Sequence, residues 1–68
     1  MIEVDISGEK GNAFWLIAYA KDLVKQLNGI DKEYNSDEIT NEMMSGDYNH
    51  LLNTFDRYFG DYVELTNR

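Results

Sequence analysis

One long apolar segment, residues 11–29, most constrains what this chain can fold into. Its apolar residues recur at three- and four-residue spacing, which is typical of the buried face of an α-helix. They are Ala13, Leu16, Ile17, Ala20, Leu23, Val24 and Leu27. Asn12 is placed to cap the first turn of this helix, and Gly29 is placed to end the last turn. We therefore predict a central helix that forms the middle of the core.

The start of this helix carries more apolar surface than one buried face needs. On a helical projection, Phe14, Trp15 and Ala18 fall well away from that face. Trp15 lies in line with polar positions further along, so a helix buried along its apolar face presents the indole to solvent. We therefore expect a protein interface at Phe14, Trp15, Ala18 and Tyr19. The alternative, in which a sheet covers Trp15 and makes it part of the core, stays open.

Both ends of the chain show the alternation of a half-buried strand. In residues 1–7 the apolar face is predicted to hold Ile2, Val4 and Ile6. In residues 61–66, a segment rich in β-formers, the apolar face is predicted to hold Val63 and Leu65. Residues 7–11 are predicted to turn the chain into the central helix, with Gly8 and Gly11 permitting positive φ.

Two shorter helices are predicted between the central helix and the last strand. Asn35 or Ser36 caps the first of them, because Asn35 precedes Glu38 by the three residues of a capping box. This helix is expected to end at Gly46, and Asp47 is placed to cap the next one. The apolar face of the first short helix comprises Ile39, Met43 and Met44. The apolar face of the second comprises Tyr48, Leu51, Leu52, Phe55, Tyr58 and Phe59.

The predicted elements follow the order β-α-α-α-β in one small α+β domain, residues 1–68. An isolated strand leaves its backbone groups unpaired, so the two terminal strands are predicted to pair in a two-stranded sheet packed on the central helix. The third helix is expected to cover the other side of the central helix. Whether the strands run parallel or antiparallel stays open.

The charge balance limits the partners that the chain can bind. Thirteen acidic and six basic residues give a net charge of −7, and most of the excess lies after Asn35. Binding to nucleic acid needs clustered Lys and Arg, so we expect no direct nucleic-acid contact. The longest apolar run, residues 13–20, is shorter than the roughly 20 residues that span a bilayer, so we expect no membrane insertion. The lack of cysteine fits a reducing cytoplasm.

Two patterns only partly match ligand-binding motifs. Gly8 and Gly11 precede a helix as in a phosphate cradle, but the third glycine and the Gly-Lys-Ser/Thr sequence of such motifs are missing. Oxygen-bearing side chains also follow the spacing of a calcium loop. They are Asp31, Glu33, Asn35, Asp37 and Glu42. Ser36 stands where that loop needs a glycine, which argues against calcium binding.

His50 is the single histidine of the chain. No cysteine exists, and no serine is placed in sequence to suggest a nucleophile that His50 would activate. We expect His50 to lie on the surface, in the first turn of its helix. A chain of 68 residues also offers little room for a deep pocket. We therefore expect no enzymatic activity, no cofactor and no metal.

Four short motifs spread over nearly the whole chain resemble those of one family. They are Ile6-Ser7-Gly8, Gly11-Asn12-Ala13-Phe14, Ser45-Gly46-Asp47-Tyr48 and Phe59-Gly60-Asp61-Tyr62-Val63. With them the chain resembles small uncharacterised proteins encoded by tailed bacteriophages. The resemblance brings no catalytic or binding residues. It implies a setting in the infected bacterial cytoplasm, where short acidic phage proteins often act by binding and altering host proteins.

From these observations we expect a non-enzymatic protein-binding module. It would be a phage accessory protein that contacts a host or phage protein, or a second copy of itself, through the aromatic start of the central helix. One alternative is an acidic DNA mimic, whose carboxylates after Asn35 occupy the basic cleft of a nucleic-acid-binding protein. A further alternative is a small domain that binds a metal or a nucleotide.

Calcium is predicted to leave the stability of the protein unchanged, because the loop pattern lacks its glycine. Thermal melts recorded with calcium and with a chelator should therefore coincide. A site that binds only the folded state would add about 2.7 kcal/mol at 100 times its dissociation constant. That gain would raise the melting temperature by several degrees, and such a rise would contradict the prediction.

Overall fold

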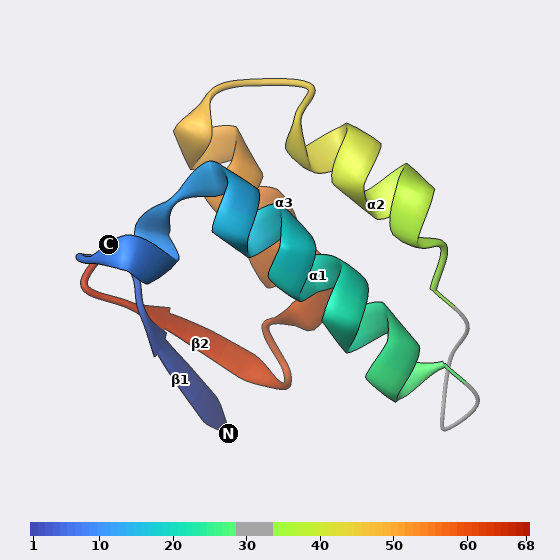
Figure 1. Ribbon diagram of the computed structural model, residues 1–68, viewed down its shortest axis with the longest axis horizontal. Coiled ribbons are helices and arrows are strands. Elements are labelled where there is room, and N and C mark those ends of the chain that lie inside the picture. Colours follow the sequence, from blue (N-terminus) through green and yellow to red (C-terminus); the bar gives the residue numbers. More distant parts are fainter. Residues whose placement is uncertain (29–33) are drawn as a thin grey trace.

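Three helices connect the two terminal strands in a computed structural model that describes residues 1–28 and 34–68. The elements are β1 (Ile2–Asp5), the short 3₁₀ helix η1 (Glu9–Gly11), α1 (Ala13–Leu27), α2 (Ser36–Met43), α3 (Tyr48–Phe59) and β2 (Val63–Thr66). In Figure 1 the sheet lies below the helices, α1 lies in front of α3, and α2 lies beside them. The predicted β-α-α-α-β order and the two-stranded terminal sheet are confirmed.

Polar side chains cap all three α-helices at their first residues, as predicted. The side-chain oxygens of Asn12, Asn35 and Asp47 each accept a hydrogen bond from a first-turn N–H group, over 2.8, 3.0 and 2.8 Å respectively. Asn35, and not Ser36, is therefore the cap of α2. These bonds satisfy donors that a helix start otherwise leaves unpaired, which is why the helices begin where they do.

α2 does not end at its predicted glycine, and α1 is followed by an asparagine that bonds the next described segment. α2 ends at Met43, three residues before the predicted end at Gly46, and Met44 is its C-cap. α1 is followed by Asn28, whose side-chain oxygen accepts a hydrogen bond from the Tyr34 N–H group at 2.7 Å. Its side-chain nitrogen donates to the Tyr34 carbonyl oxygen at 3.2 Å. Gly29, the predicted end of the central helix, lies outside the described residues.

The terminal strands pair in parallel, which settles the direction that the sequence left open. Ile2 lies beside Val63 in the register, and Val4 lies beside Leu65. β1 ends at Asp5, earlier than the predicted segment 1–7. Oδ1 of Asp5 accepts hydrogen bonds from the N–H and the hydroxyl group of Ser7, at 2.9 and 2.7 Å, and so turns the chain.

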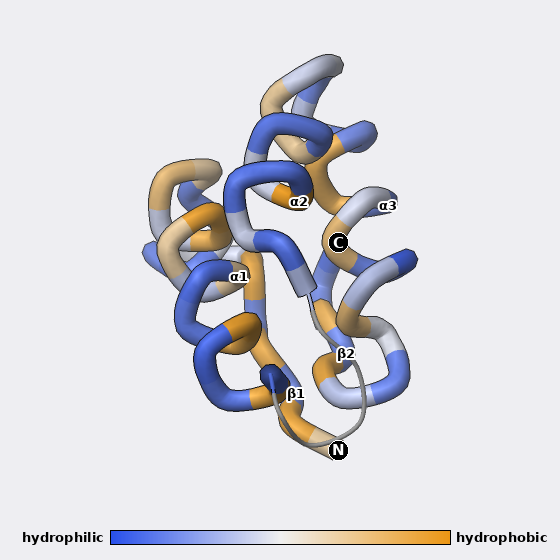
Figure 2. The backbone as a smooth tube through the Cα atoms, turned by 90° about the vertical axis from the view of Figure 1, so that its right-hand side faces the viewer, coloured by the Kyte–Doolittle hydropathy of each residue, from blue (hydrophilic) through white to orange (hydrophobic). Residues whose placement is uncertain are grey.

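The core lies between the sheet and the three helices, and hydrophobic residues recur along every element that borders it (Figure 2). Phe55 and Phe59 of α3 have no exposed surface, and neither do Leu16 and Ala20 of α1. The prediction that β1 buries its whole apolar face is wrong at one position. Val4 and Ile6 are buried, but Ile2 is 50% exposed because no described element covers the outer side of β1 at its start.

Gly11 is needed for a close approach and not for positive φ. The segment after β1 forms the 3₁₀ helix η1 in place of a simple turn, and neither Gly8 nor Gly11 adopts positive φ. A side-chain carbon at Gly11 would overlap the carbonyl group of Ile6. The lack of a side chain therefore lets η1 pack directly on the residue that follows β1.

Two ion pairs tie α3 to its neighbours at the surface. Arg57 of α3 bonds Glu42 of α2, and the Tyr58 hydroxyl donates to the same carboxylate at 2.7 Å. The bond from Arg57, followed by that from Tyr58, lowers the pKa of Glu42. Arg68 bonds Asp56 in the same way near the end of the chain. Because these groups are solvent-exposed, each pair contributes modestly to stability.

Phe55→Ala should destabilise the protein strongly. The ring is fully buried, and its centroid lies 5.1 Å from that of Phe59 and 6.1 Å from that of Tyr19. Truncating such a ring removes about 3–5 kcal/mol, a large share of the stability of a small domain. Chemical denaturation should show a nearly unfolded variant. A loss below about 1 kcal/mol would contradict the central position of Phe55.

The Asp5 carboxyl should contribute to stability at neutral pH and lose that contribution in acid. Hydrogen bonds from the Ser7 side chain, then from Asn67, lower the pKa of Asp5 from 3.8 to about 2. A carboxyl with a depressed pKa in the folded state stabilises above its unfolded pKa, and this effect fades as the pH falls from about 4 to about 2. In Ser7→Ala, the Asp5 pKa measured by NMR titration should rise toward 3.8. An unchanged pKa would show that Ser7 is not the cause.

Candidate functional site

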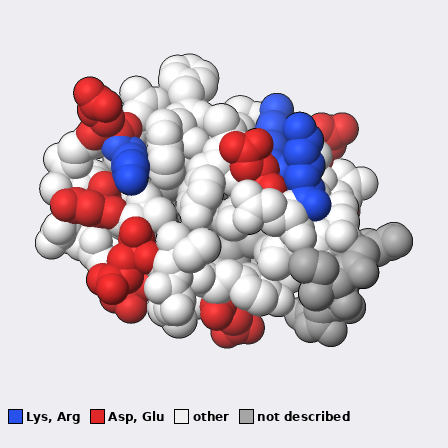
Figure 3. Space-filling view, turned by 60° about the horizontal axis from the view of Figure 1, so that its bottom comes forward, with Lys and Arg blue, Asp and Glu red and all other residues white. Residues whose placement is uncertain are grey.

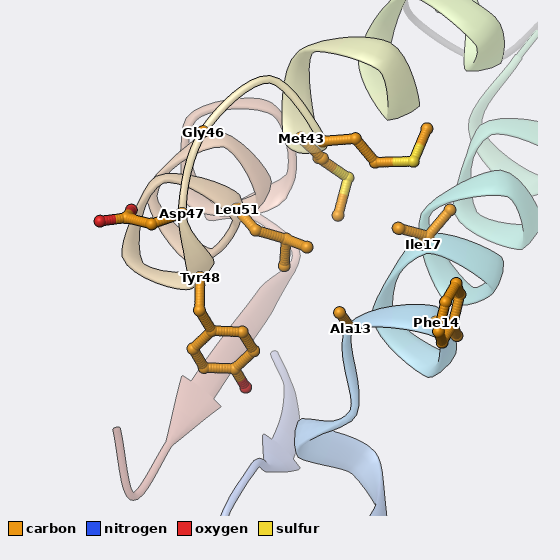
Figure 4. A pocket seen from close by; sticks show the side chains of 9 residues that line it. Ala13, Phe14, Ile17, Met43, Gly46, Asp47, Tyr48 and Leu51 are labelled. Atoms are coloured by element: carbon orange, nitrogen blue, oxygen red, sulfur yellow. The ribbon is translucent and has the colours of Figure 1, made fainter.

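A shallow apolar groove lies between the start of α1 and the turn that joins α2 to α3 (Figure 4). Its volume is about 320 Å³. Residues from all three α-helices and the turn line it. They are Ala13, Phe14, Ile17, Met43, Met44, Gly46, Asp47, Tyr48 and Leu51. Figure 4 shows Phe14 and Ile17 on one side of this groove and Met43, Leu51 and Tyr48 on the other.

The groove gathers most of the large hydrophobic side chains that the fold leaves in solvent. Five such side chains are exposed in the described part of the chain, and three of them line the groove: Phe14 (82% exposed), Met44 (55%) and Tyr48 (41%). The total accessible surface of 4456 Å² matches the roughly 4,400 Å² that a folded chain of this mass presents. The exposed patch is therefore a local feature and not a sign of loose packing.

Hydrogen bonds hold the α1 side of the groove in place. The Asn12 cap orients the first turn of α1, from which Phe14 projects. The Tyr48 hydroxyl, at the start of α3, donates to the carbonyl oxygen of Gly11 just before α1. This bond joins the two helix starts, so it sets the distance between the two sides of the groove.

His50 holds the turn that forms the other side. Its Nε2 atom lies 2.9 Å from the carbonyl oxygen of Glu42 and 3.0 Å from the hydroxyl oxygen of Ser45. The imidazole ring packs so closely against Gly46 that a side chain there would collide with it. His50 is thus half-buried and structural, which corrects the expectation of a surface residue.

Ser45 and His50 are in contact, as a serine nucleophile and its histidine base would be, and the sequence analysis did not predict this contact. A carbonyl oxygen only accepts hydrogen bonds, so the bond to Glu42 requires the proton of a neutral His50 to sit on Nε2. In that tautomer Nε2 has no lone pair to take the Ser45 proton. The Ser45 hydroxyl itself donates to the Glu42 carbonyl at 2.7 Å. The arrangement therefore closes the turn and does not activate Ser45.

Of the four predicted interface residues, Phe14 alone lines the groove. Ala18 is exposed one turn further along α1. Trp15 and Tyr19 are half-buried against the core, with ring centroids 5.0 Å apart. Burial raises the pKa of the Tyr19 hydroxyl. The projection that placed Trp15 in solvent is therefore only partly right, because the indole covers Tyr19, which in turn packs on Phe55.

Met44 and Tyr48 are exposed groove residues that the sequence analysis placed in the buried faces of their helices. Met44 follows the last residue of α2, and Tyr48 is the first residue of α3. Helix-terminal residues are where an extrapolated helical face is least reliable, since the chain there leaves the helical path. The adjacent Gly46 and Asp47 mark the turn in the sequence, and they were the one signal of this departure.

Several described residues of the two ligand patterns form bonds within the fold. Around Gly8 and Gly11, the N–H groups of Gly11 and Asn12 donate to backbone carbonyls at 3.0 and 3.2 Å, as parts of η1. In the calcium pattern Asn35 caps α2 and Glu42 bonds Arg57, while Asp31 and Glu33 lie outside the described residues. Within residues 1–28 and 34–68, His, Asp and Glu side chains form no group of three that could hold a metal ion.

Comparisons with known proteins found no match for this chain. No protein-family model matches it, and neither a curated protein nor a solved structure matches it. In the described part of the chain, the helices are too short or too polar to cross a membrane.

Proposed function

We propose that this protein is a non-enzymatic protein-binding module that holds an apolar side chain of a partner in the groove between α1 and the α2–α3 turn. The observation that carries the proposal is the convergence of Phe14, Met44 and Tyr48, all exposed, on that single groove. Contiguous apolar surface of this kind marks interaction sites in soluble proteins. Exposed aromatic and methionine side chains are also enriched in such interfaces.

The size of the groove favours a protein partner over a small molecule. Pockets that enclose a ligand usually measure about 300–1,000 Å³, and this groove, at about 320 Å³, is at the lower end and open on one side. It has room for one or two large side chains. The floor formed by Met43 and Leu51 is buried, while the rim is exposed, as in interfaces with an apolar centre.

Charge favours a different protein over a second copy of this chain. Each copy carries a net charge of −7, so two copies repel one another, whereas a basic segment is attracted. The proposed occupant is therefore a segment of another protein with an apolar side chain and basic residues beside it. The proposed setting, the infected bacterial cytoplasm, rests on the phage resemblance alone.

The DNA-mimic alternative has less support. Of the carboxylates after Asn35, Glu42 and Asp56 bond arginines and Asp47 caps α3, so three have partners within the chain. In Figure 3 the acidic groups on the visible face lie in several separate places, with basic groups among them. A phosphate mimic needs a row of unpaired carboxylates to face a basic cleft.

Phe14→Ser and Met44→Ser should each remove partner binding without unfolding the protein. Both side chains are exposed, so their loss should change the free energy of unfolding by within about 0.5 kcal/mol. The measurement is affinity capture from bacterial lysate at low and high salt, with a thermal melt of each variant. Ala18→Gln, on the same helix but outside the groove, is the matched control and should capture the partner normally.

Three outcomes would contradict the proposal. Capture that survives both serine variants would place the partner elsewhere. Capture that is unchanged in both serine variants but is lost at high salt would favour the acidic mimic. Binding would then depend on charge attraction, which salt screens, and not on apolar contact. A dimer in sedimentation that dissociates in Phe14→Ser would show that a second copy occupies the groove.

A further inference from the structure

The outer edge of β1 carries backbone groups that β2 does not use. The N–H groups of Ile2 and Ile6 donate to carbonyl oxygens on the β2 side, at 3.0 and 3.1 Å. Successive residues of a strand direct these groups to opposite edges, so the N–H groups of Glu3 and Asp5 face away from β2. Within residues 1–28 and 34–68 the sheet has two strands, and β1 forms its outer side (Figure 1). Unpaired strand edges of this kind are templates for a further strand.

The core-facing side of the sheet is also incomplete at this edge. Ile2 and Val63 are neighbours in the register and share one face, yet Ile2 is 50% exposed and Val63 is 1% exposed. Ile2 also borders a hollow at the end of the sheet where β2 begins, which Leu23 and Leu27 of α1 line together with Asp61 and Tyr62. A third strand next to β1 would place an apolar side chain beside Ile2 and would cover apolar surface that the helices leave open.

The solvent-facing side of the same edge is acidic. Glu3 lies beside Glu64 in the register, and like charges in that position repel. Asp5 follows on the same face and is exposed. A strand with basic residues on this face would relieve the repulsion.

A second copy of β1 does not meet this requirement. Two outer edges pairing with each other would bring Glu3 and Asp5 of one chain against the same residues of the other, and opposed like charges are destabilising. Charge complementarity therefore selects a partner with the opposite sign on its solvent face.

We propose that the outer edge of β1 binds a strand of another protein in which apolar residues, beside Ile2 and Val4, alternate with Lys or Arg, beside Glu3 and Asp5. The main-chain bonds supply affinity and the alternation supplies specificity, as in other cases of strand addition. No residue of the groove belongs to the sheet, so this second surface is independent of the proposed function.

A synthetic peptide of about ten residues that alternates Val and Lys is the probe, and a peptide that alternates Val and Glu is its control. Titration with the Val-Lys peptide, followed by NMR, should shift the amide signals of Glu3 and Asp5 and slow their hydrogen exchange. The Val-Glu peptide should do neither. The amides around Phe14 and Met44 should stay unchanged.

Three variants separate the contributions of charge and backbone. Glu3→Gln combined with Asp5→Asn should weaken binding about tenfold, or about 1.4 kcal/mol. Glu64→Gln, which removes a carboxylate from the same face but one strand further away, should weaken it less. Glu3→Pro should abolish binding, because it removes an outward N–H group that the β1–β2 ladder does not use, and proline is tolerated on an outer strand.

Several results would overturn this inference. Shifts confined to the groove would place the peptide there, which would support the proposed function and exclude the strand edge. Equal binding of the two peptides, or equal losses in Glu3→Gln/Asp5→Asn and Glu64→Gln, would exclude charge selection. Unchanged binding by a folded Glu3→Pro variant would exclude main-chain pairing. If Glu3→Pro unfolds, the exchange rates of Glu3 and Asp5 in the intact protein decide the same question.

Discussion

Parallel pairing between the first and last strands is the constraint on which the rest of this fold depends. Parallel strands need a connection that brings the chain back to the end of the sheet where it began. Here the chain reverses direction at each step from β1 through α1, α2 and α3 to β2 (Figure 1). Four reversals restore the original direction, so β2 runs parallel to β1. The helices that make this return also form the core above the sheet, where α3 contacts β2 and α2 packs on α1 and α3.

The cover is one-sided, which is unusual for parallel strands. Parallel sheets are normally buried on both faces and therefore apolar on both. In this protein Glu3, Asp5 and Glu64 occupy the second face and are exposed. Two strands joined by one helical layer also leave β1 at the margin, where Ile2 loses the cover that Val63 receives from the helices. The exposed edge of β1 thus follows from the topology itself.

Sequence periodicity was enough to predict the two strands, the three α-helices and their order. The helix starts were predicted from residue type, because they depend on local chemistry at Asn12, Asn35 and Asp47. The parallel direction was also within reach, since an even number of chain reversals requires it. The exposure of Ile2 could not be predicted from the sequence. Alternation shows which face of a strand a residue occupies, but whether another element covers that face depends on packing between segments far apart in the chain.

The candidate site shows the same limit. Phe14 could be singled out from the sequence, because a helical projection separates it from the buried face of α1. The prediction that Trp15 faces solvent was only partly right, because its indole packs on Tyr19, one turn along the helix. Tyr19 in turn packs on the buried Phe55. Met44 and Tyr48 were placed wrongly because they flank a turn.

The bonds from Tyr48 to Gly11 and from His50 to Glu42 fix that turn before any partner binds. A groove held in this way need not be ordered on binding, so less of the interaction energy is lost to conformational entropy than in a site formed by a flexible loop.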